Sequence, residues 1–160
     1  MPPQEDSNLC GVSTSAYVYN DARAIGSEII DASTYLGNNV FDIYVSIKKR
    51  HNSEVQNLGH RLIGNNYSKS VWIFDDDINI HDYNEILWAY QTRCQPNRDI
   101  VITGNMMHGA SLDPSSPLFR STSKIFYDCT IPIGNTKEET EYNQRRHAKV
   151  RVPFSNDVSW

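Results

Sequence analysis

The sequence predicts an α/β fold, with one domain and a mostly parallel sheet that carries helices on both faces. Three observations lead to this prediction. The chain has 160 residues, which is enough for one hydrophobic core. Short apolar stretches at 43–47, 71–74 and 100–102 are typical of strands. Segments with helical spacing lie between them, and such alternation favours parallel strands joined by right-handed crossovers.

The first strand is predicted at 40–47, because apolar and polar side chains alternate there with the period of a half-buried strand. It ends at the basic run Lys48-Lys49-Arg50. Residues 53–63 then show apolar side chains at helical spacing behind Ser53, a candidate N-cap. One amphipathic helix is therefore expected between the first two strands.

The second strand, 71–74, is wholly apolar, as expected for a strand covered on both faces, and stops at Asp75-Asp76-Asp77. Asp82 with Glu85 forms a capping signal for the next helix. Residues 100–102 (IVI) supply the third strand. The order strand, helix, strand, helix, strand between 40 and 103 is the basis of the parallel sheet.

Beyond residue 103, glycines and prolines punctuate a long polar loop. A further strand is predicted at 123–130, and a last helix begins at Thr136, with acidic residues early and basic residues late. We expect residues 1–39 to form an N-terminal arm or a divergent junction, 40–151 the α/β domain, and 152–160 a tail.

Composition excludes several classes of protein. No apolar run approaches the length of a membrane span, and the N-terminus lacks the pattern of a secretory signal, so a cytoplasmic location is expected. The formal net charge of −4 argues against nucleic acid as a partner. The three cysteines, Cys10, Cys94 and Cys129, are far apart in the sequence and are expected to be reduced thiols.

The aspartates at 75–77 are the strongest chemical signal in the residues themselves. Asp75 and Asp77 follow a buried strand, where they either share a divalent cation that holds a nucleotide diphosphate or cap the loop and pair with nearby basic side chains. The run Lys48-Lys49-Arg50 either meets a phosphate or is a solvated strand end. The five histidines lack metal-ligand spacing on a predicted helix, so we expect ordinary surface histidines.

A longer set of residues resembles the UbiD family of carboxy-lyases, which includes polyprenyl-hydroxybenzoate, phenolic-acid and cinnamic-acid decarboxylases. The resemblance spans about 40 to 134 in the order of the family. It is carried by VSIKK at 45–49, DDDINIHD at 75–82, EILWA at 85–89, Thr92-Arg93, Pro96, Arg98-Asp99, Leu112-Asp113-Pro114, and Ser123-Lys124 with Asp128 and Thr130.

The resemblance implies a UbiD-like C-terminal domain and a cofactor. Enzymes of this family bind prenylated FMN with a divalent metal (Mn or Mg) and K, and reversibly decarboxylate aromatic or α,β-unsaturated carboxylic acids. The modified flavin acts as an electron sink, and a Glu-Arg-Glu network handles the proton. Those groups and the metal ligands belong to a central domain that precedes the matched region. The resemblance therefore assigns no catalytic residue and no metal ligand to this chain.

One cofactor contact is implied by the same resemblance. A lysine on the family's strand corresponding to 40–48 reaches the flavin phosphate; Lys48 fits that position, and Lys49 is the second choice. In the family the triple aspartate is a signature of the C-terminal domain. We therefore expect residues 75–77 to stabilise the loop and a domain contact, through Arg93 or Arg98.

Three functional hypotheses follow. In the first, the chain is the C-terminal domain, a fragment or a small subunit of a UbiD-like decarboxylase, with a catalytic UbiD-like domain or subunit as partner. It contributes the phosphate contact and oligomer packing, forms a homo-oligomer, and is inactive alone. In the second, it is a non-catalytic interaction or assembly domain. In the third, Asp75 and Asp77 hold a metal in a nucleotide-sugar-binding domain.

Overall fold

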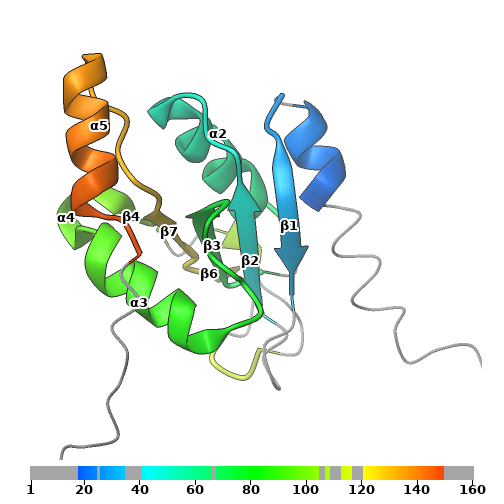
Figure 1. The fold of residues 1–160 in the computed structure, drawn as a ribbon. Helices are drawn as coiled ribbons and strands as arrows, with labels where there is room; N and C mark the ends of the chain where they lie inside the picture. The colour runs from blue at the N-terminus through cyan, green and yellow to red at the C-terminus, as the bar shows by residue number, and fades with distance from the viewer. Residues whose placement is uncertain are drawn as a thin grey trace, which may run out of the picture.

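The computed structural model of the chain describes residues 18–24, 26–34, 41–65, 68–104, 107–108, 113–116 and 121–149. A five-stranded sheet has the order β1-β2-β3-β7-β4, and a two-stranded sheet pairs β5 with β6 (Figure 1). The strands are β1 (Ile29–Ser33), β2 (Asp42–Ile47), β3 (Ser70–Asp75), β4 (Ile100–Ile102), β5 (Met107–His108), β6 (Ser121–Thr122) and β7 (Ile125–Cys129).

Five helical segments accompany the sheets in the described part of the chain. Residues 18–24 form the first. The others are α2 (Asn52–Ile63), α3 (Tyr83–Arg93), α4 (Pro96–Asp99) and α5 (Lys137–Arg146). Within the described ranges, no helix combines the length and apolar character that a membrane crossing requires.

The centre of the main sheet is parallel, as predicted, and both edges are antiparallel. Strands β2, β3 and β7 run in the same direction, whereas β1 pairs antiparallel with β2 and β4 antiparallel with β7. The reversal of β4 has a local cause. The segment before α3 buries Ile78 and Ile80, and Arg93 at the end of α3 contacts Asp75. Helix α3 therefore returns the chain to the end of β3, and β4 starts from there.

Strand β1 lies before residue 40, where we expected the domain to begin. Its residues Ala32 and Ser33 are buried, and the strand pairs with β2 through a register that shifts between Ile29 and Asp31. Val18 and Ala22, from the helix at 18–24, are buried in the same core as α2. The described sheet and its core therefore include residues on both sides of position 40.

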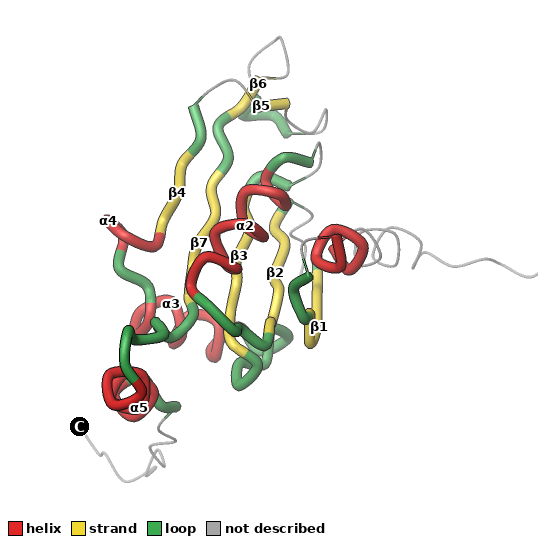
Figure 2. The backbone as a smooth tube through the Cα atoms, turned by 90° about the horizontal axis from the view of Figure 1, so that it is seen from above, coloured by secondary structure: helices red, strands yellow, loops and turns green. Residues whose placement is uncertain are grey.

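Helices cover both faces of the sheet, as predicted, and each face has its own core (Figures 1 and 2). The face under α2 is mainly aliphatic, with Phe126 as its large aromatic side chain. The face under α3 contains an aromatic stack across three strands, in which Trp72 lies between Tyr44 and Tyr127 at centroid distances of 6.2 and 3.8 Å. The strands therefore direct mainly aliphatic side chains to the face under α2 and the stacked aromatic side chains to the face under α3.

The helix ends follow the capping rules in two of three predicted cases. The side chain of Asp82 accepts from Asn84 N at the start of α3, and that of Thr136 accepts from Glu139 N at the start of α5. Helix α2 instead begins after His51, whose side chain makes no capping hydrogen bond, so the proposed Ser53 cap was wrong.

Helix α5 differs from the other long helices because none of its residues is buried. It lies at the periphery in both views (Figures 1 and 2). Polar contacts hold it: the Asn143 side chain donates to Pro132 O at 3.0 Å, and Arg93 donates to His147 O at 3.2 Å. The predicted tail at 152–160 and most of the loop between β4 and β6 lie outside the described residues.

Candidate functional site at the carboxyl ends of the parallel strands

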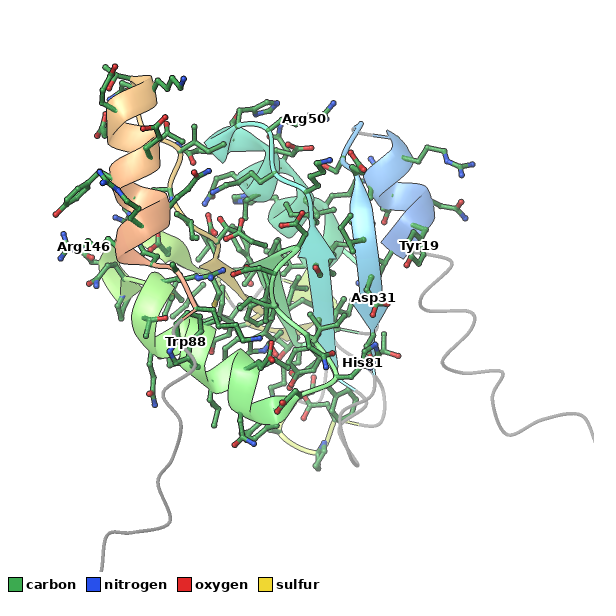
Figure 3. All side chains as sticks on the ribbon, in the orientation of Figure 1. Tyr19, Asp31, Arg50, His81, Trp88 and Arg146 are labelled. Carbon is green, nitrogen blue, oxygen red and sulfur yellow. The ribbon has the colours of Figure 1, made fainter. Side chains whose placement is uncertain are left out.

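The three parallel strands end at one edge of the sheet, and chemically active side chains follow each of them. Lys48 and Lys49 follow β2, Asp75 ends β3, and Thr130 follows β7. Arg50, labelled in Figure 3, lies at the same edge and pairs with Glu54 at 2.9 Å. Ligands of open α/β sheets bind outside the carboxyl ends of the strands, so this edge is the candidate site.

A polar cleft of about 190 Å³ lies at this edge. Its walls come from the ends of β2 and β3, from the loop after β7, and from α5. The lining residues are Lys48, Lys49, Asp75, Asp76, Asp77, Ile131, Pro132, Ile133, Thr140 and Gln144. The cleft is smaller than the ~300–1,000 Å³ of typical small-molecule sites, so it suits one group of a ligand rather than a whole cofactor.

The two neighbouring lysines have different roles. Lys49 Nζ donates to Thr130 Oγ1 at 2.7 Å and to Ile131 O at 2.5 Å, and lies 3.4 Å from Asn52 Oδ1. Burial lowers the pKa of Lys49, although nearby carboxylates oppose the shift. Lys49 therefore joins the end of β2 to the loop after β7.

Lys48, by contrast, is exposed, and its ammonium makes no hydrogen bond or ion pair with any residue that the structure describes. Its backbone N–H donates to Glu28 O at 3.0 Å, which fixes the main chain at the end of β2. A positive charge on a positioned backbone at the rim of a cleft is available to an anion.

The side chains of Asp75 and Asp77 meet the buried guanidinium of Arg93. Arg93 forms a bidentate pair with Asp77, at 2.7 and 2.6 Å, and donates to Asp75 Oδ2 at 3.1 Å. The Arg93 side chain is fully buried, and its guanidinium lies 5.2 Å from the Trp88 ring centroid. Of the two arginines expected to pair with the aspartates, Arg93 does so. Arg98 instead pairs with Asp99 at 2.6 Å.

The environments of the two aspartates differ. Burial raises the pKa of Asp75 to about 6, against the opposing effects of the Ile131 N–H and the charges of Lys49 and Arg93. Burial also acts on Asp77, but hydrogen bonds and charge from Arg93 outweigh it and lower the pKa of that carboxyl. The guanidinium stands between the two carboxylates, where a shared divalent cation would have to sit. The geometry therefore does not favour the metal role.

Asp128 and Thr130 brace Lys49. Asp128 Oδ1 accepts from the Thr130 N–H at 3.0 Å and from its hydroxyl at 2.5 Å, and the hydroxyl oxygen accepts from Lys49. Burial raises the pKa of Asp128. Asp128 and Thr130, which the family resemblance includes, therefore hold the ammonium of Lys49 in place.

Sequence reasoning missed other parts of the edge. The side chain of Asn52 donates to Ile133 O at 2.8 Å and accepts from Ile133 N at 2.9 Å, and it thereby sets the loop after β7. Thr140 and Gln144 bring α5 to the cleft. No sequence pattern relates Asn52 to Ile133, which lie 81 positions apart. The helix that contains Thr140 was predicted, but its position beside the cleft was not.

His51 and His81 are exposed and lie beside polar side chains. His81 Nε2 lies 2.8 Å from Asp31 Oδ2, and His51 Nδ1 lies 2.9 Å from Ser53 Oγ. His81 and Asp31 are labelled in Figure 3. Among the described residues, no three His, Cys, Asp or Glu side chains are grouped as a metal site needs.

The fold and the edge together define an α/β domain that presents an exposed lysine beside a small cleft lined by charged residues. Residues 7–129 match the model of the 3-octaprenyl-4-hydroxybenzoate carboxy-lyase C-terminal domain, so the chain belongs to the UbiD family. The anhydromevalonate phosphate decarboxylase of Archaeoglobus fulgidus is 38% identical over 95 residues, which are 59% of this chain and 22% of that protein.

Solved structures agree with this assignment. The UbiD-class enzyme HmfF from Pelotomaculum thermopropionicum, in complex with FMN, matches with a TM-score of 0.74 and 28% identity over 89% of this chain and 31% of that chain. An evolved dimeric form of HmfF in complex with prFMN matches with a TM-score of 0.64 and 24% identity, covering 89% and 28%. The chain spans about a third or less of the length of the curated relatives it matches.

Proposed function

We propose that the chain serves as the C-terminal part of a UbiD-type decarboxylase that acts on an aromatic or α,β-unsaturated carboxylic acid. It contributes one cation to the phosphate of prenylated FMN and a surface for packing in a homo-oligomer. Membership of the family and the FMN and prFMN in the HmfF structures support this proposal. The observation that carries it is the exposed ammonium of Lys48 at the rim of the cleft, which has no hydrogen-bond or ion-pair partner among the described residues.

The residues at the carboxyl edge fit the phosphate end of such a cofactor. Lys48 would hold the phosphate as a point charge, because Lys49 is already committed to Thr130 and Ile131. When bound, prenylated FMN supplies the electron-accepting ring of the reaction. The cleft accommodates only a small group, so the ring and the divalent metal would be held by the partner's catalytic domain.

The chain alone is then expected to be inactive. At the described edge the acidic groups Asp75 and Asp77 are paired with Arg93, and Asp128 is occupied by Thr130. None of these carboxyl groups is positioned as a free proton donor beside the cleft. Decarboxylation of an aromatic acid by the purified chain with added cofactor, in the absence of any partner, would contradict this expectation.

The proposal is tested by co-expressing the chain with a UbiD-type catalytic chain and measuring flavin absorbance in the purified complex. Lys48→Ala should weaken flavin binding by at least about tenfold and so lower flavin occupancy, because a charge-assisted contact contributes about 1.5–3 kcal/mol. The matched control is Lys137→Ala, which removes one exposed lysine from α5. Equal occupancy in the two variants would refute the role of Lys48.

The same experiment separates the alternatives. A stable complex without flavin and without decarboxylase activity would identify a non-catalytic assembly domain. Manganese-dependent binding of a nucleotide sugar, lost in Asp77→Asn, would instead revive the nucleotide-sugar hypothesis.

A further inference from the structure

Helix α5 contacts the rest of the described domain through one side. Thr140 and Gln144 line the cleft, and the Asn143 side chain donates to Pro132 O at 3.0 Å. Figures 1 and 2 both show the helix at the periphery, and none of its residues is buried. The side of α5 opposite these contacts is therefore a surface that the described part of the domain leaves exposed.

This exposed side carries four side chains with helical spacing. Positions i, i+3, i+4 and i+7 share one side of an α-helix. In α5 these positions are Glu138, Glu141, Tyr142 and Arg145, and all four are exposed. Tyr142 is 53% exposed and supplies the apolar surface of the group. We call these four residues the outer row.

The two ends of the outer row have opposite charges. Glu138 lies in the first turn of α5, and Arg145 lies in the last turn. Seven positions separate them, which is about 10 Å along a helix, so they do not pair with each other. Among the described residues, neither side chain has a hydrogen-bond or ion-pair partner. Each end of the row therefore presents a charge to the solvent.

The outer row is complementary to itself when a second copy runs antiparallel. A two-fold axis between positions 141 and 142 places Glu138 opposite Arg145 of the second copy, and Arg145 opposite Glu138. The two Tyr142 rings then lie beside the axis and pack together. Glu141 also lies there, and Lys137, 3.9 Å away on the same helix, offsets its charge. A parallel arrangement would instead place like charges together at both ends.

We propose that the outer row of α5 is a docking surface for a second copy of this chain, in an antiparallel helix pair around a two-fold axis. This inference rests on the homo-oligomer of the proposed function and names the surface that packs. A helix of 10 residues is about 15 Å long, so the contact is small and the pair should form only at high protein concentration. Because the charges at both ends are exposed, salt should weaken the pair.

Sedimentation equilibrium of the full chain tests this surface. At low ionic strength, the weight-average mass should rise from that of one chain toward that of two as the protein concentration increases. High salt should move this rise to higher protein concentration, since the facing charges are screened.

Charge reversal identifies the residues. Glu138→Arg and Arg145→Glu should each weaken dimerisation by at least about tenfold, because like charges then face each other at both ends. The double variant Glu138→Arg/Arg145→Glu should restore it, because the facing charges are again opposite. An equimolar mixture of the two single variants should form a heterodimer for the same reason.

The matched control is Arg23→Glu. It makes the same change of charge as Arg145→Glu, at an exposed position on the first helix, which lies away from α5 (Figure 1). This variant should dimerise like the parent chain.

Two kinds of result would overturn the proposal. One is a chain that stays monomeric at every concentration in low salt. The other is dimerisation that neither single variant weakens, or that the double variant fails to restore. The mass and flavin occupancy of the complex with a catalytic chain test the proposed function separately, because the outer row contains none of the residues that line the cleft.

Discussion

A lysine lies at each end of the parallel strands, and the two lysines have different hydrogen-bond partners and different charged surroundings. At the carboxyl end, Lys49 donates to Thr130 and Ile131 and is surrounded by the carboxylates of Asp75, Asp99 and Asp128. At the amino end, Lys124 is 1% exposed and donates to the carbonyl of Asn65, and burial lowers its pKa to about 8. Lys49 therefore belongs to a charged network, whereas Lys124 donates to a single backbone carbonyl.

The difference separates a potential binding edge from a structural one. The carboxyl end concentrates charges of both signs and leaves Lys48 with no described partner. At the amino end, the exposed lysine is paired, because Lys69 contacts Asp113 at 3.1 Å and Ser115 at 2.6 Å. An exposed lysine without a partner among the described residues can take an external anion, whereas Lys69, which is paired with Asp113, stabilises the fold.

The largest expected effect is on Arg93. Arg93→Met should lower the free energy of unfolding by about 3–5 kcal/mol, because it removes the buried guanidinium that pairs with both carboxylates. Urea denaturation measures the change. Arg98→Met is the matched control: its side chain is 55% exposed, so its ion pair contributes about 1 kcal/mol or less. Similar losses in both variants would show that the carboxyl end is not organised around Arg93.

A smaller loss is expected at Lys49. Lys49→Met removes the donor to the Ile131 carbonyl and the charge beside Asp75 and Asp128, so the free energy of unfolding should fall by about 1–3 kcal/mol. Lys48→Met should change it by no more than about 0.5 kcal/mol. Denaturation of the two variants side by side sharpens the distinction between a bracing lysine and a binding lysine. A larger loss of unfolding free energy in Lys48→Met than in Lys49→Met would show that Lys48, not Lys49, is the bracing lysine.

The smallest effect is a pH dependence from the amino end. The folded pKa of Lys124, about 8, lies below its ordinary value of 10.5, so the unfolded chain binds more protons between these values. Stability should therefore rise with pH across this window, by about 1–2 kcal/mol from about pH 8 to about pH 9.5. Denaturant midpoints over this range, compared with those of Lys124→Met, isolate the contribution. Parallel curves for the two proteins would show that Lys124 is not desolvated.

Much of the fold could be predicted because the apolar patterns are local. The alternation over 43–47 and the apolar run at 71–74 coincide with β2 and β3, and the caps at Asp82 and Thr136 are one-turn interactions. Strand β1 was missed because Ile29–Ser33 contains two apolar residues followed by a charged one, which is no clear alternation. The direction of β4 depends on where α3 ends, and that is a tertiary property.

The site could be predicted only in outline. Lys48 and the aspartates are recognisable because they follow strands directly, and Arg93 was among the expected partners. The commitment of Lys49 to Thr130 could not be foreseen, since the partners are 81 positions apart and meet only through the pairing of β2, β3 and β7. The same parallel pairing brings Asn52 to the loop after β7. Long-range register, which no local pattern encodes, decides which of the two lysines lacks a partner in the described part of the chain.

The attachment of α5 has a physical consequence of its own. This helix buries no side chain, and it is held by polar contacts such as Asn143 with Pro132 O, Arg93 with His147 O, and the ion pair of Lys149 with Glu85. One wall of the cleft is therefore attached to the sheet by hydrogen bonds and a partly buried ion pair, without the apolar contacts that hold the other long helices.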